Sequence, residues 1–313
     1  MIIRVEHICK VYREVKALND ISFDVNEGEI FGFIGPDGAG KTTLFRILTS
    51  LILPDSGKAI VDGFDVVRDF RKVRSAIGYM PGQFSLYSDL TVEENLVFFA
   101  TVFGTTIEAN YHLIRDIYVQ IEPFKKRLAG RLSGGMKQKL ALSCALIHEP
   151  RVLVLDEPTT GVDAVSRQEF WELLKGLKAK GITILVSTPY MDEASLCDRI
   201  ALIQKGSVLA IDTPVGIVQS LGGEIVSVRT DELYRLLRDL RSYPDTYSVF
   251  PFGQDVHLTC KSQKAGLETL QKYLQQKQHD HIRIETITPG IEDIFMKLME
   301  KEEMDNKELR MKS

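Results

Sequence analysis

Residues 30–43 have the sequence IFGFIGPDGAGKTT, in which an apolar run precedes a glycine-rich loop. The loop fits the pattern G-x-x-x-x-G-K-[ST]. Glycines lack a Cβ atom, so consecutive backbone N–H groups can turn inward around phosphate oxygens, and the following helix adds the positive end of its dipole. Lys41 supplies a cation for the β- and γ-phosphates, and the Thr42 hydroxyl is a ligand for Mg²⁺. The predicted nucleotide-binding residues are Gly35, Pro36, Asp37, Gly38, Ala39, Gly40, Lys41, Thr42 and Thr43.

A second apolar run, Val152–Leu155, is followed by two acids, Asp156 and Glu157. Charges at the end of a buried strand are costly unless they face a cation. Beside a phosphate loop that need is met, because Asp156 can hold Mg²⁺ together with Thr42, and Glu157 can orient and deprotonate an attacking water. The alternative interpretation is that the two acids only cap the helix that follows.

Apolar runs alternate with helix-like segments along residues 1–220. Helices are predicted over residues 42–52 and from the capping box at Thr91–Glu94 to about residue 103. The runs at 152–155 and 182–186 are continuously apolar, which suits parallel strands buried on both faces. We therefore predict an α/β fold whose sheet is mostly parallel, with an additional antiparallel part. The predicted strands are 2–5, 21–25, 30–34, 58–61, 77–79, 152–155, 182–186 and a hairpin of 200–203 with 208–211.

The composition changes near residues 221–223, and a second domain is predicted over 222–299. Its expected order is strand 224–229, helix 231–241, strands 247–252 and 256–260, helix 263–276, strand 282–286 and helix 291–299. This βαββαβ order matches a small α+β unit of the split-βαβ, ferredoxin-like kind. Leucines 233, 236, 237 and 240 would form one apolar stripe, as would 267, 270 and 274. The charged residues 300–313 are expected to form a solvated tail.

The composition excludes several classes of protein. With 313 residues, 44% hydrophobic and 26% charged, the chain is of globular type. Its formal net charge of −4 offers no basic surplus for a phosphate backbone, so no nucleic-acid partner is expected. Its cysteines have neither metal nor redox spacing, which favours free thiols in a reducing compartment. The N-terminal residues do not resemble a secretory signal, and no apolar window of about 18 residues predicts a membrane span.

The segment LSGGMKQ, residues 132–138, opens a predicted helix and lies between the phosphate loop and the acidic pair. It resembles the LSGGQ signature of ATP-binding cassette (ABC) ATPases, and the resemblance covers about residues 1–220. It implies an ABC nucleotide-binding domain over 1–221 with a helical signature subdomain at about 84–150. The residues Thr160–Asp163 are similar to the family's D-loop, and Tyr12 lies where the family stacks an aromatic ring on adenine. The resemblance implies trans contacts to ATP from Leu132, Ser133, Gly134, Gly135 and Gln138, and a D-loop role for Asp163.

This resemblance implies a working unit of two cassettes, head to tail, with ATP and Mg²⁺ between one phosphate loop and the other signature. The partners would be membrane permease subunits and either a second copy or a second ABC ATPase subunit. The helical subdomain would dock a short permease helix, with Phe84 and Tyr87 as contacts and Phe99 and Phe103 in the core. The block Thr288–Phe295 resembles the tail of bacterial drug-export ATPases of the daunorubicin type. A cytoplasmic protein, peripheral on the inner face of the cell membrane, is therefore expected.

Two positions depart from the family pattern. Gly82 follows Tyr79-Met80-Pro81 where the family has its Q-loop glutamine, and Gln83 comes one residue late. Pro189 stands at the switch-histidine position and has neither an imidazole nor a backbone N–H. Removing one donor from developing charge typically costs roughly 10²–10³-fold in rate. We therefore hypothesise an asymmetric pair in which this chain's own site binds ATP, with Glu157 and Gln83 as its catalytic residues, but turns over slowly.

Two other functions stay open from the sequence. A soluble ABC ATPase unconnected with transport is one, although the single cassette and the acidic charge make ribosomal and DNA-repair types less favoured. A non-catalytic ATP-binding partner subunit is the other: Pro189 supports it and the intact Glu157 opposes it. An ordinary homodimeric ATPase, in which Glu157 alone suffices, is the simplest alternative to the asymmetric pair.

Overall fold

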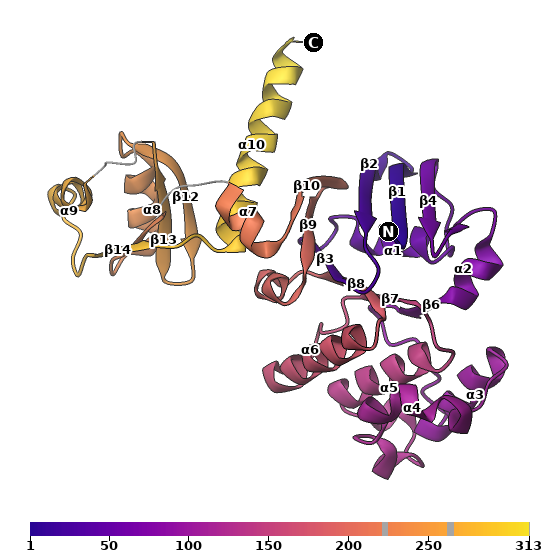
Figure 1. Ribbon diagram of the computed structural model, residues 1–313. Helices are drawn as coiled ribbons and strands as arrows, with labels where there is room; N and C mark the ends of the chain where they lie inside the picture. Colours follow the sequence, from indigo (N-terminus) through magenta and orange to yellow (C-terminus); the bar gives the residue numbers. More distant parts are fainter. Residues whose placement is uncertain (221–224, 262–265, 313) are drawn as a thin grey trace. The chain divides into compact units, whose positions relative to one another are not determined.

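Figure 1 shows the computed structural model of the chain, which describes residues 1–220, 225–261 and 266–312, with side chains described up to residue 302. The chain divides into two compact units, Met1–Pro214 and Val215–Ser313. The predicted domain boundary at residues 221 and 222 lies outside the described residues.

The first unit is built around a six-stranded sheet in the order β10-β9-β3-β8-β7-β6. Its pairs β9–β3, β3–β8, β8–β7 and β7–β6 are parallel, and only the hairpin pair β9–β10 is antiparallel. Since the central strands are buried on both faces, their sequences are mainly apolar, and the polar residues of β7 and β8 lie at the strand ends. The strands are β3 (Ile30–Ile34), β6 (Ile77–Met80), β7 (Val152–Asp156), β8 (Thr183–Thr188), β9 (Arg199–Gln204) and β10 (Ser207–Asp212).

A separate antiparallel sheet of order β2-β1-β4-β5 belongs to the same unit. Helix α1 contacts both this sheet and β7, so it is the shared core element of the two sheets. The rings of Phe23, Phe31, Phe33 and Phe45 form a continuous aromatic chain through that core, with centroids 4.8–5.9 Å apart. The elements are β1 (Ile3–Tyr12), β2 (Val15–Val25), β4 (Ser56–Val61), β5 (Phe64–Asp65) and α1 (Lys41–Leu48).

Helices α3, α4 and α5 pack on one another and form the helical part of this unit (Figure 1). The capping box predicted at Thr91 and Glu94 is present: the Thr91 hydroxyl accepts from Glu94 N, and the Glu94 carboxylate accepts from Thr91 N. The helices of the unit are α2 (Phe70–Ala76), α3 (Val92–Val102), α4 (Ile107–Tyr118), α5 (Gly134–Leu146) and α6 (Ala164–Ala179).

The second unit has a four-stranded antiparallel sheet in the order β12-β13-β11-β14, with α8 and α9 as the connections. This is the βαββαβ order expected from the sequence. Leu236, Leu240, Leu270 and Leu274 are buried in its core, whereas Leu267, predicted to belong to the same stripe, is 39% exposed. The elements are α7 (Pro214–Ser220), β11 (Ile225–Arg229), α8 (Leu233–Arg241), β12 (Thr246–Phe252), β13 (Asp255–Cys260), α9 (Leu267–Gln276), β14 (Arg283–Ile287) and α10 (Ile291–Lys312).

The predicted elements of the first unit occur, with differences at their ends. Helix α1 ends at Leu48, so the expected helix over 42–52 is too long by one turn. Strands β1 and β2 extend well beyond the predicted 2–5 and 21–25, because they pair along their whole length with irregular register. At the predicted hairpin, Lys205 and Gly206 both have positive φ, which is typical of a type I′ turn.

Candidate functional site

The loop between β3 and α1 has the backbone of a phosphate-binding loop. Gly38 and Gly40 have φ of 77° and 107°, a region that residues with a Cβ atom rarely adopt. Gly40 is the N-cap of α1 and has no side chain to satisfy the first N–H groups of the helix. Those N–H groups and the helix dipole are therefore available to an anion at the mouth of the loop.

Two of the loop glycines are also required by close packing. A Cβ atom on Gly40 would lie 2.5 Å from the carbonyl oxygen of Ala17, and one on Gly35 would overlap the carbonyl oxygen of Ile203. A Cβ on Gly38 would meet nothing within 4 Å, so this glycine is needed for its positive φ alone. The packing explains why the loop is held close to the neighbouring strands.

Lys41 is folded onto its own loop. It is 3% exposed, and its Nζ donates to the carbonyl oxygens of Gly35 at 2.7 Å and Pro36 at 3.0 Å. The same Nζ lies 3.3 Å from Oε1 of Glu157. The predicted phosphate-binding cation and the predicted catalytic acid thus form an ion pair in the structure, although 116 positions separate them in the sequence.

The two acids after β7 are held by Ser187 on the adjacent strand β8. Asp156 is 2% exposed and pairs in register with Ser187. The Ser187 hydroxyl donates to Asp156 Oδ1 at 2.6 Å, and both its hydroxyl and its carbonyl oxygen accept from Glu157 N at 3.0 Å. Glu157 itself has φ 49°, a conformation uncommon for a non-glycine residue and found often at active sites.

Ser187 is a site residue that the sequence did not single out for this role. Tyr79 on β6 is another: burial first, and then the charge of Asp156, raises the pKa of this tyrosine to about 12, so it stays neutral near the acids. The sequence feature that could have indicated Ser187 is a hydroxyl residue at the end of an apolar strand. The signal could be interpreted only once β7 and β8 were known to be neighbours.

The signature residues lie at the start of α5. Ser133 is the N-cap of this helix, and its Oγ accepts from Met136 N at 3.4 Å. Ser133 and Gly134 are exposed, while Leu132 is buried and anchors the segment. Gly135 packs close to Ser166 on α6, so the signature and the D-loop region are neighbours within one chain.

The remaining predicted residues occupy three other places. Asp163 is exposed and caps α6, accepting from Ser166 N at 3.0 Å; this backbone hydrogen bond lowers the pKa of Asp163. Tyr12 ends β1 and is 45% exposed, with Lys10 Nζ 5.7 Å from its ring centroid. Pro189 follows β8 directly, and the carbonyl oxygen of the preceding Thr188 accepts from Gly35 N at 3.3 Å. The switch position is therefore next to the phosphate loop.

Gly82 and Gln83 lie beside the acids. A Cβ atom on Gly82 would lie 3.1 Å from the carbonyl oxygen of Asp156 and 3.7 Å from Cβ of Glu157. Gln83 is exposed and lines the same small cavity as Glu157 and Gln138. Within the described residues Gln83 makes no hydrogen bond to Glu157, and the catalytic role of Gln83 stays a prediction.

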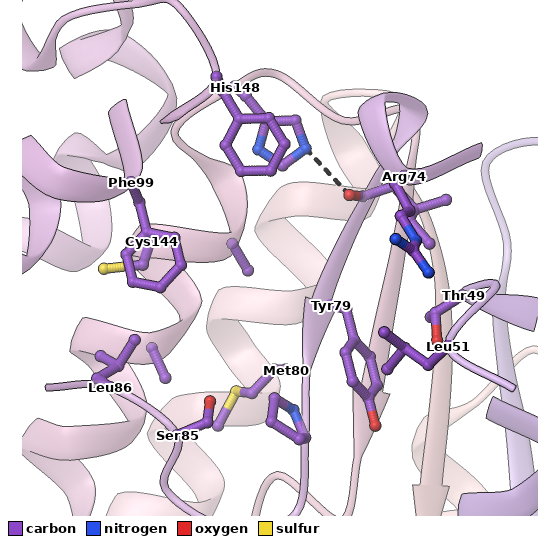
Figure 2. A pocket seen from close by; sticks show the side chains of 15 residues that line it. Thr49, Leu51, Arg74, Tyr79, Met80, Ser85, Leu86, Phe99, Cys144 and His148 are labelled. Carbon is purple, nitrogen blue, oxygen red and sulfur yellow. Dashed lines mark hydrogen bonds between the residues drawn. The ribbon is translucent and has the colours of Figure 1, made fainter. Parts of the chain in front are cut away.

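A second, larger cavity of about 220 Å³ lies between β6 and the helical part, and we name it the aromatic cavity (Figure 2). Tyr79, Met80, Phe99 and Cys144 line it together with His148. His148 stacks on Phe103 at 3.7 Å between ring centroids and shares a 3.0 Å hydrogen bond from Nε2 to the carbonyl oxygen of Ile77. Burial lowers the pKa of His148 and raises that of the Cys144 thiol.

The aromatic cavity corrects one expectation. Phe99 and Phe103 were predicted to be core residues, but both line the cavity and Phe103 is 38% exposed. Leu96, which has the same helical spacing, is a core residue as expected, and the other buried positions of α3 are Val92, Ala100 and Asn95. The Asn95 side chain bonds the backbone of the preceding loop. The buried face of α3 therefore does not include Phe99, and Phe103 is the C-cap of the helix.

The fold and this site define a P-loop nucleotide-binding domain with a helical signature subdomain. Residues 18–160 match the family model described as ABC transporter. Among solved structures, an ATP-binding subunit of an ABC transporter is similar over 71% of this chain and 94% of its own, with TM-score 0.65 and 28% identity. A dimeric post-hydrolysis state of the ATP-binding cassette MJ0796, bound to ADP and Pi, has TM-score 0.61 and 26% identity, covering 67% of this chain and 98% of that one.

Curated relatives are similar along nearly the whole chain. The chain is 38% identical over 287 residues to the probable multidrug ABC transporter ATP-binding protein YbhF of Escherichia coli strain K12; the match covers 90% of the chain and 49% of YbhF, so the chain spans about half the length of that relative. It is 34% identical to a Nod factor export ATP-binding protein of Burkholderia lata over 95% of the chain and 96% of the relative. A daunorubicin resistance ATP-binding protein of Streptomyces coeruleorubidus is 35% identical over 95% and 94%.

The chain belongs to the ABC transporter family of ATP-binding cassette ATPases. The family resemblance drawn from the phosphate loop, the acidic pair and the signature is thereby confirmed, as is the α/β cassette fold. Within the described residues, no helix is both long enough and apolar enough to cross a membrane.

Proposed function

We propose that this chain binds and hydrolyses ATP as the energising subunit of an ABC exporter whose permeases are separate chains. One observation carries the proposal: the fold brings Lys41 of the phosphate loop within 3.3 Å of Glu157 after β7, with Asp156 clamped beside it by Ser187. A phosphate-binding cation, a metal-binding carboxylate and a base for water are the parts that phosphoryl transfer needs.

The donor set fits ATP with Mg²⁺. The hydroxyl of Thr42 and the carboxylate of Asp156 are hard oxygen ligands of the kind Mg²⁺ takes. When bound, Mg²⁺ would neutralise charge on the phosphates. Lys41 and the N–H groups from Gly38 to Thr43 would hold the phosphate oxygens, Tyr12 would stack on adenine, and Glu157 would orient the attacking water and accept its proton.

The exposed signature supports a two-cassette unit. Ser133, Gly134 and the D-loop residue Asp163 are exposed on the single chain, so they are free to meet an ATP held by another cassette. A dimeric cassette among the similar structures supports the same arrangement. The second cassette is either another copy or a different ABC subunit; relatives of about twice this length have room for a second unit in one chain.

The aromatic cavity is the proposed docking site for a short cytoplasmic helix of the permease. It is largely apolar and opens between β6 and the helical subdomain, and Phe84 and Tyr87 on the adjoining loop are 37% and 47% exposed. Exposed aromatic side chains beside an apolar pocket are typical anchors of a protein interface. This docking would hold the chain at the inner face of the cell membrane as a peripheral, cytoplasmic subunit, with residues 222–299 as an accessory domain.

Export is favoured by the relatives. Their names describe multidrug transport, Nod factor export and daunorubicin resistance, and they match both the cassette and the C-terminal unit. The transported substrate would bind to the permeases.

The asymmetric pair is part of the proposal. Gly82 places no side chain beside Glu157, and Pro189 places no hydrogen-bond donor after Thr188, next to the phosphate loop. Lys41 and the loop amides are unaffected by either residue. ATP binding would therefore be normal and turnover at this chain's own site slow, while its signature completes the site of a fully equipped partner.

Phosphate release from MgATP by the purified chain, with Glu157→Gln as control, tests the proposal. We expect tight ATP binding, weak hydrolysis abolished in the control, and a clear increase in rate for Pro189→His. Fast turnover, on the order of 1 s⁻¹ or more, without any gain from Pro189→His would contradict the asymmetric pair. Binding with no hydrolysis in either protein would favour the second candidate, a non-catalytic ATP-binding partner subunit.

A further inference from the structure

The end of β1 that carries Tyr12 extends beyond the neighbouring strand β4. In the sheet, β1 lies between β2 and β4 (Figure 1). The last residue of β1 that pairs with β4 is Cys9, and its partner Ser56 is the first residue of β4. In the described part of the chain, residues 10–12 pair with β2 alone. The backbone groups on the other side of this segment are therefore open to partners that are not part of a strand.

Asp55, the residue before β4, takes the place of a strand on that side. Its backbone N–H donates to the carbonyl oxygen of Cys9 at 2.9 Å. Its carboxylate accepts twice: Oδ2 accepts from Val11 N at 2.7 Å, and Oδ1 accepts from Lys10 Nζ at 2.7 Å. Three groups of one residue thus hold three consecutive residues of β1, directly before Tyr12.

The Lys10 ammonium connects Asp55 to the ring of Tyr12. Its Nζ lies 5.7 Å from the ring centroid, inside the range of about 6 Å in which a cation is attracted by an aromatic ring. The Lys10 side chain is only 17% exposed, and its ion pair with Asp55 fixes where the ammonium lies. The hydrogen bond from Lys10 first, and then that from Val11, lowers the pKa of Asp55, so the residue keeps its negative charge. One carboxylate therefore holds both the backbone before Tyr12 and the cation at its ring.

The hairpin of β1 and β2 that carries Tyr12 lies against the phosphate loop. A Cβ atom on Gly40 would lie 2.5 Å from the carbonyl oxygen of Ala17 on β2. Tyr12 pairs with Val15, two residues before Ala17. At a rise of about 3.4 Å per residue, this pair lies roughly 7 Å along the strand from the loop contact. Since Tyr12 is 45% exposed, its ring offers accessible surface to the base of a nucleotide whose phosphates are held by the loop.

We propose that Asp55 is a positioning residue for adenine binding: its carboxylate holds Val11 and Lys10 so that the Tyr12 ring is placed to stack on the base before ATP arrives. The contact with the base belongs to Tyr12, and Asp55 acts through that ring. A binding group that is held in its bound position loses less conformational entropy when the ligand binds. Asp55 therefore strengthens the binding of the base and not that of the phosphates. This inference rests on the proposed function, in which the chain binds ATP and Tyr12 stacks on adenine.

The test separates the base from the phosphates. Its two probes are MgATP and magnesium tripolyphosphate, which has three linked phosphates and no nucleoside. Calorimetry on the full chain gives both dissociation constants, and the ratio of the tripolyphosphate constant to the ATP constant reports the contribution of the nucleoside. Tyr12→Ala should lower this ratio by about 5–100-fold, the loss expected for one base–aromatic stack. Asp55→Ala should lower it by about threefold or more, as for coupled residues in contact, and leave tripolyphosphate binding unchanged.

Three further variants identify how Asp55 acts. Asp55→Asn keeps an acceptor for the Val11 N–H but loses the charge that holds Lys10, so its ratio should lie between those of the parent and Asp55→Ala. In the Tyr12→Ala background, Asp55→Ala should have no further effect, because the ring through which it acts is gone. Asp65→Ala is the matched control: Asp65 Oδ1 also accepts from two backbone N–H groups, at 2.9 and 3.0 Å, but it lies on β5 at the far edge of the same sheet. It should change neither dissociation constant.

The outcomes distinguish failure of this inference from failure of the proposed function. If Tyr12→Ala lowers the ratio and Asp55→Ala does not, Asp55 has no positioning role, while ATP binding through Tyr12 stands. The inference is also overturned if Asp55→Ala weakens both probes equally, or if its effect persists in the Tyr12→Ala background. If Tyr12→Ala leaves the ratio unchanged, or the parent binds neither probe, the proposed nucleotide contacts are themselves wrong and the inference falls with them. Because only binding is measured, slow turnover at this chain's own site does not affect the result.

Discussion

Ser187→Ala is the substitution that best tests how the acidic pair is held. The hydroxyl donates to Asp156 Oδ1 at 2.6 Å, the short distance of a charge-assisted bond, and Asp156 is 2% exposed. The backbone N–H of Glu157 keeps a partner in the variant, since the Ser187 carbonyl oxygen also accepts from it at 3.0 Å. The change therefore removes both hydrogen bonds of the hydroxyl, but only the buried carboxylate of Asp156 loses a partner that the Ser187 backbone does not replace.

The expected magnitude follows from that bond. A hydrogen bond to a charged group contributes about 1.5–3 kcal/mol, and the buried carboxylate is left without this donor. We expect the free energy of unfolding to fall by about 2–3 kcal/mol without nucleotide. Because Asp156 is the proposed Mg²⁺ ligand, its loss of orientation should weaken the apparent Mg²⁺ affinity of the ATP-loaded chain by about 10–100-fold.

Urea unfolding and Mg²⁺ titration of the ATP-loaded chain measure the two effects. Ser143→Ala is the matched control: this serine is equally buried, but its hydroxyl donates to a neutral carbonyl, that of Lys139 at 2.8 Å. It should cost only about 0.5–1.5 kcal/mol and leave the Mg²⁺ titration unchanged. If Ser187→Ala loses no more stability than Ser143→Ala and keeps the parent's Mg²⁺ dependence, the clamp has no role in holding the metal ligand.

Two further predictions concern the loop and the aromatic cavity. Gly40→Ala should lower the free energy of unfolding, measured in urea, more than Gly104→Ala does. Both glycines have positive φ, a conformation that costs a residue with a Cβ atom about 1–2 kcal/mol. Only at Gly40 would the Cβ atom also meet a backbone oxygen, that of Ala17 at 2.5 Å. If the two variants lose the same stability, the loop can move away from the Ala17 carbonyl oxygen without an energetic cost, and the argument from close packing is wrong. Burial lowers the pKa of His148, so as the pH falls the imidazole takes up a proton in the unfolded chain before it does so in the folded chain. The free energy of unfolding should therefore keep its full value above about pH 6.5 and fall as the pH drops below that value. His148→Gln should flatten the pH dependence of the unfolding free energy in that range, whereas the exposed-site control His112→Gln should not.

Much of the fold could be predicted from patterns among residues that are close in the sequence. Strand β3 occupies Ile30–Ile34 as predicted, because this short run of apolar residues and one glycine ends at the glycine-rich loop and is too short for a helix. The capping box at Thr91 likewise fixes a helix start through residues three apart. For the same reason the phosphate loop and the signature could be recognised from contiguous residues, and the family they indicate is the one found.

The rest of the site depends on pairings between distant segments. Ser187 meets Asp156 only because β7 and β8 are adjacent and in this register, which no local pattern specifies. The small cavity beside Glu157 joins three segments that are far apart in the sequence. Phe99 and Phe103 were misplaced because helical spacing identifies an apolar stripe but does not tell whether that stripe faces a core or a cavity.

The two positions that depart from the family pattern, Gly82 and Pro189, affect the groups that activate the attacking water and not the groups that bind the nucleotide. Lys41 and the clamped Asp156 depend on contacts with Gly35, Pro36 and Ser187. None of these contacts involves Gly82 or Pro189. Both departures instead remove a side chain or donor next to the catalytic acid or the phosphate loop. A chain built this way retains what holds a nucleotide and weakens what activates the attacking water, so binding and turnover should respond to different substitutions.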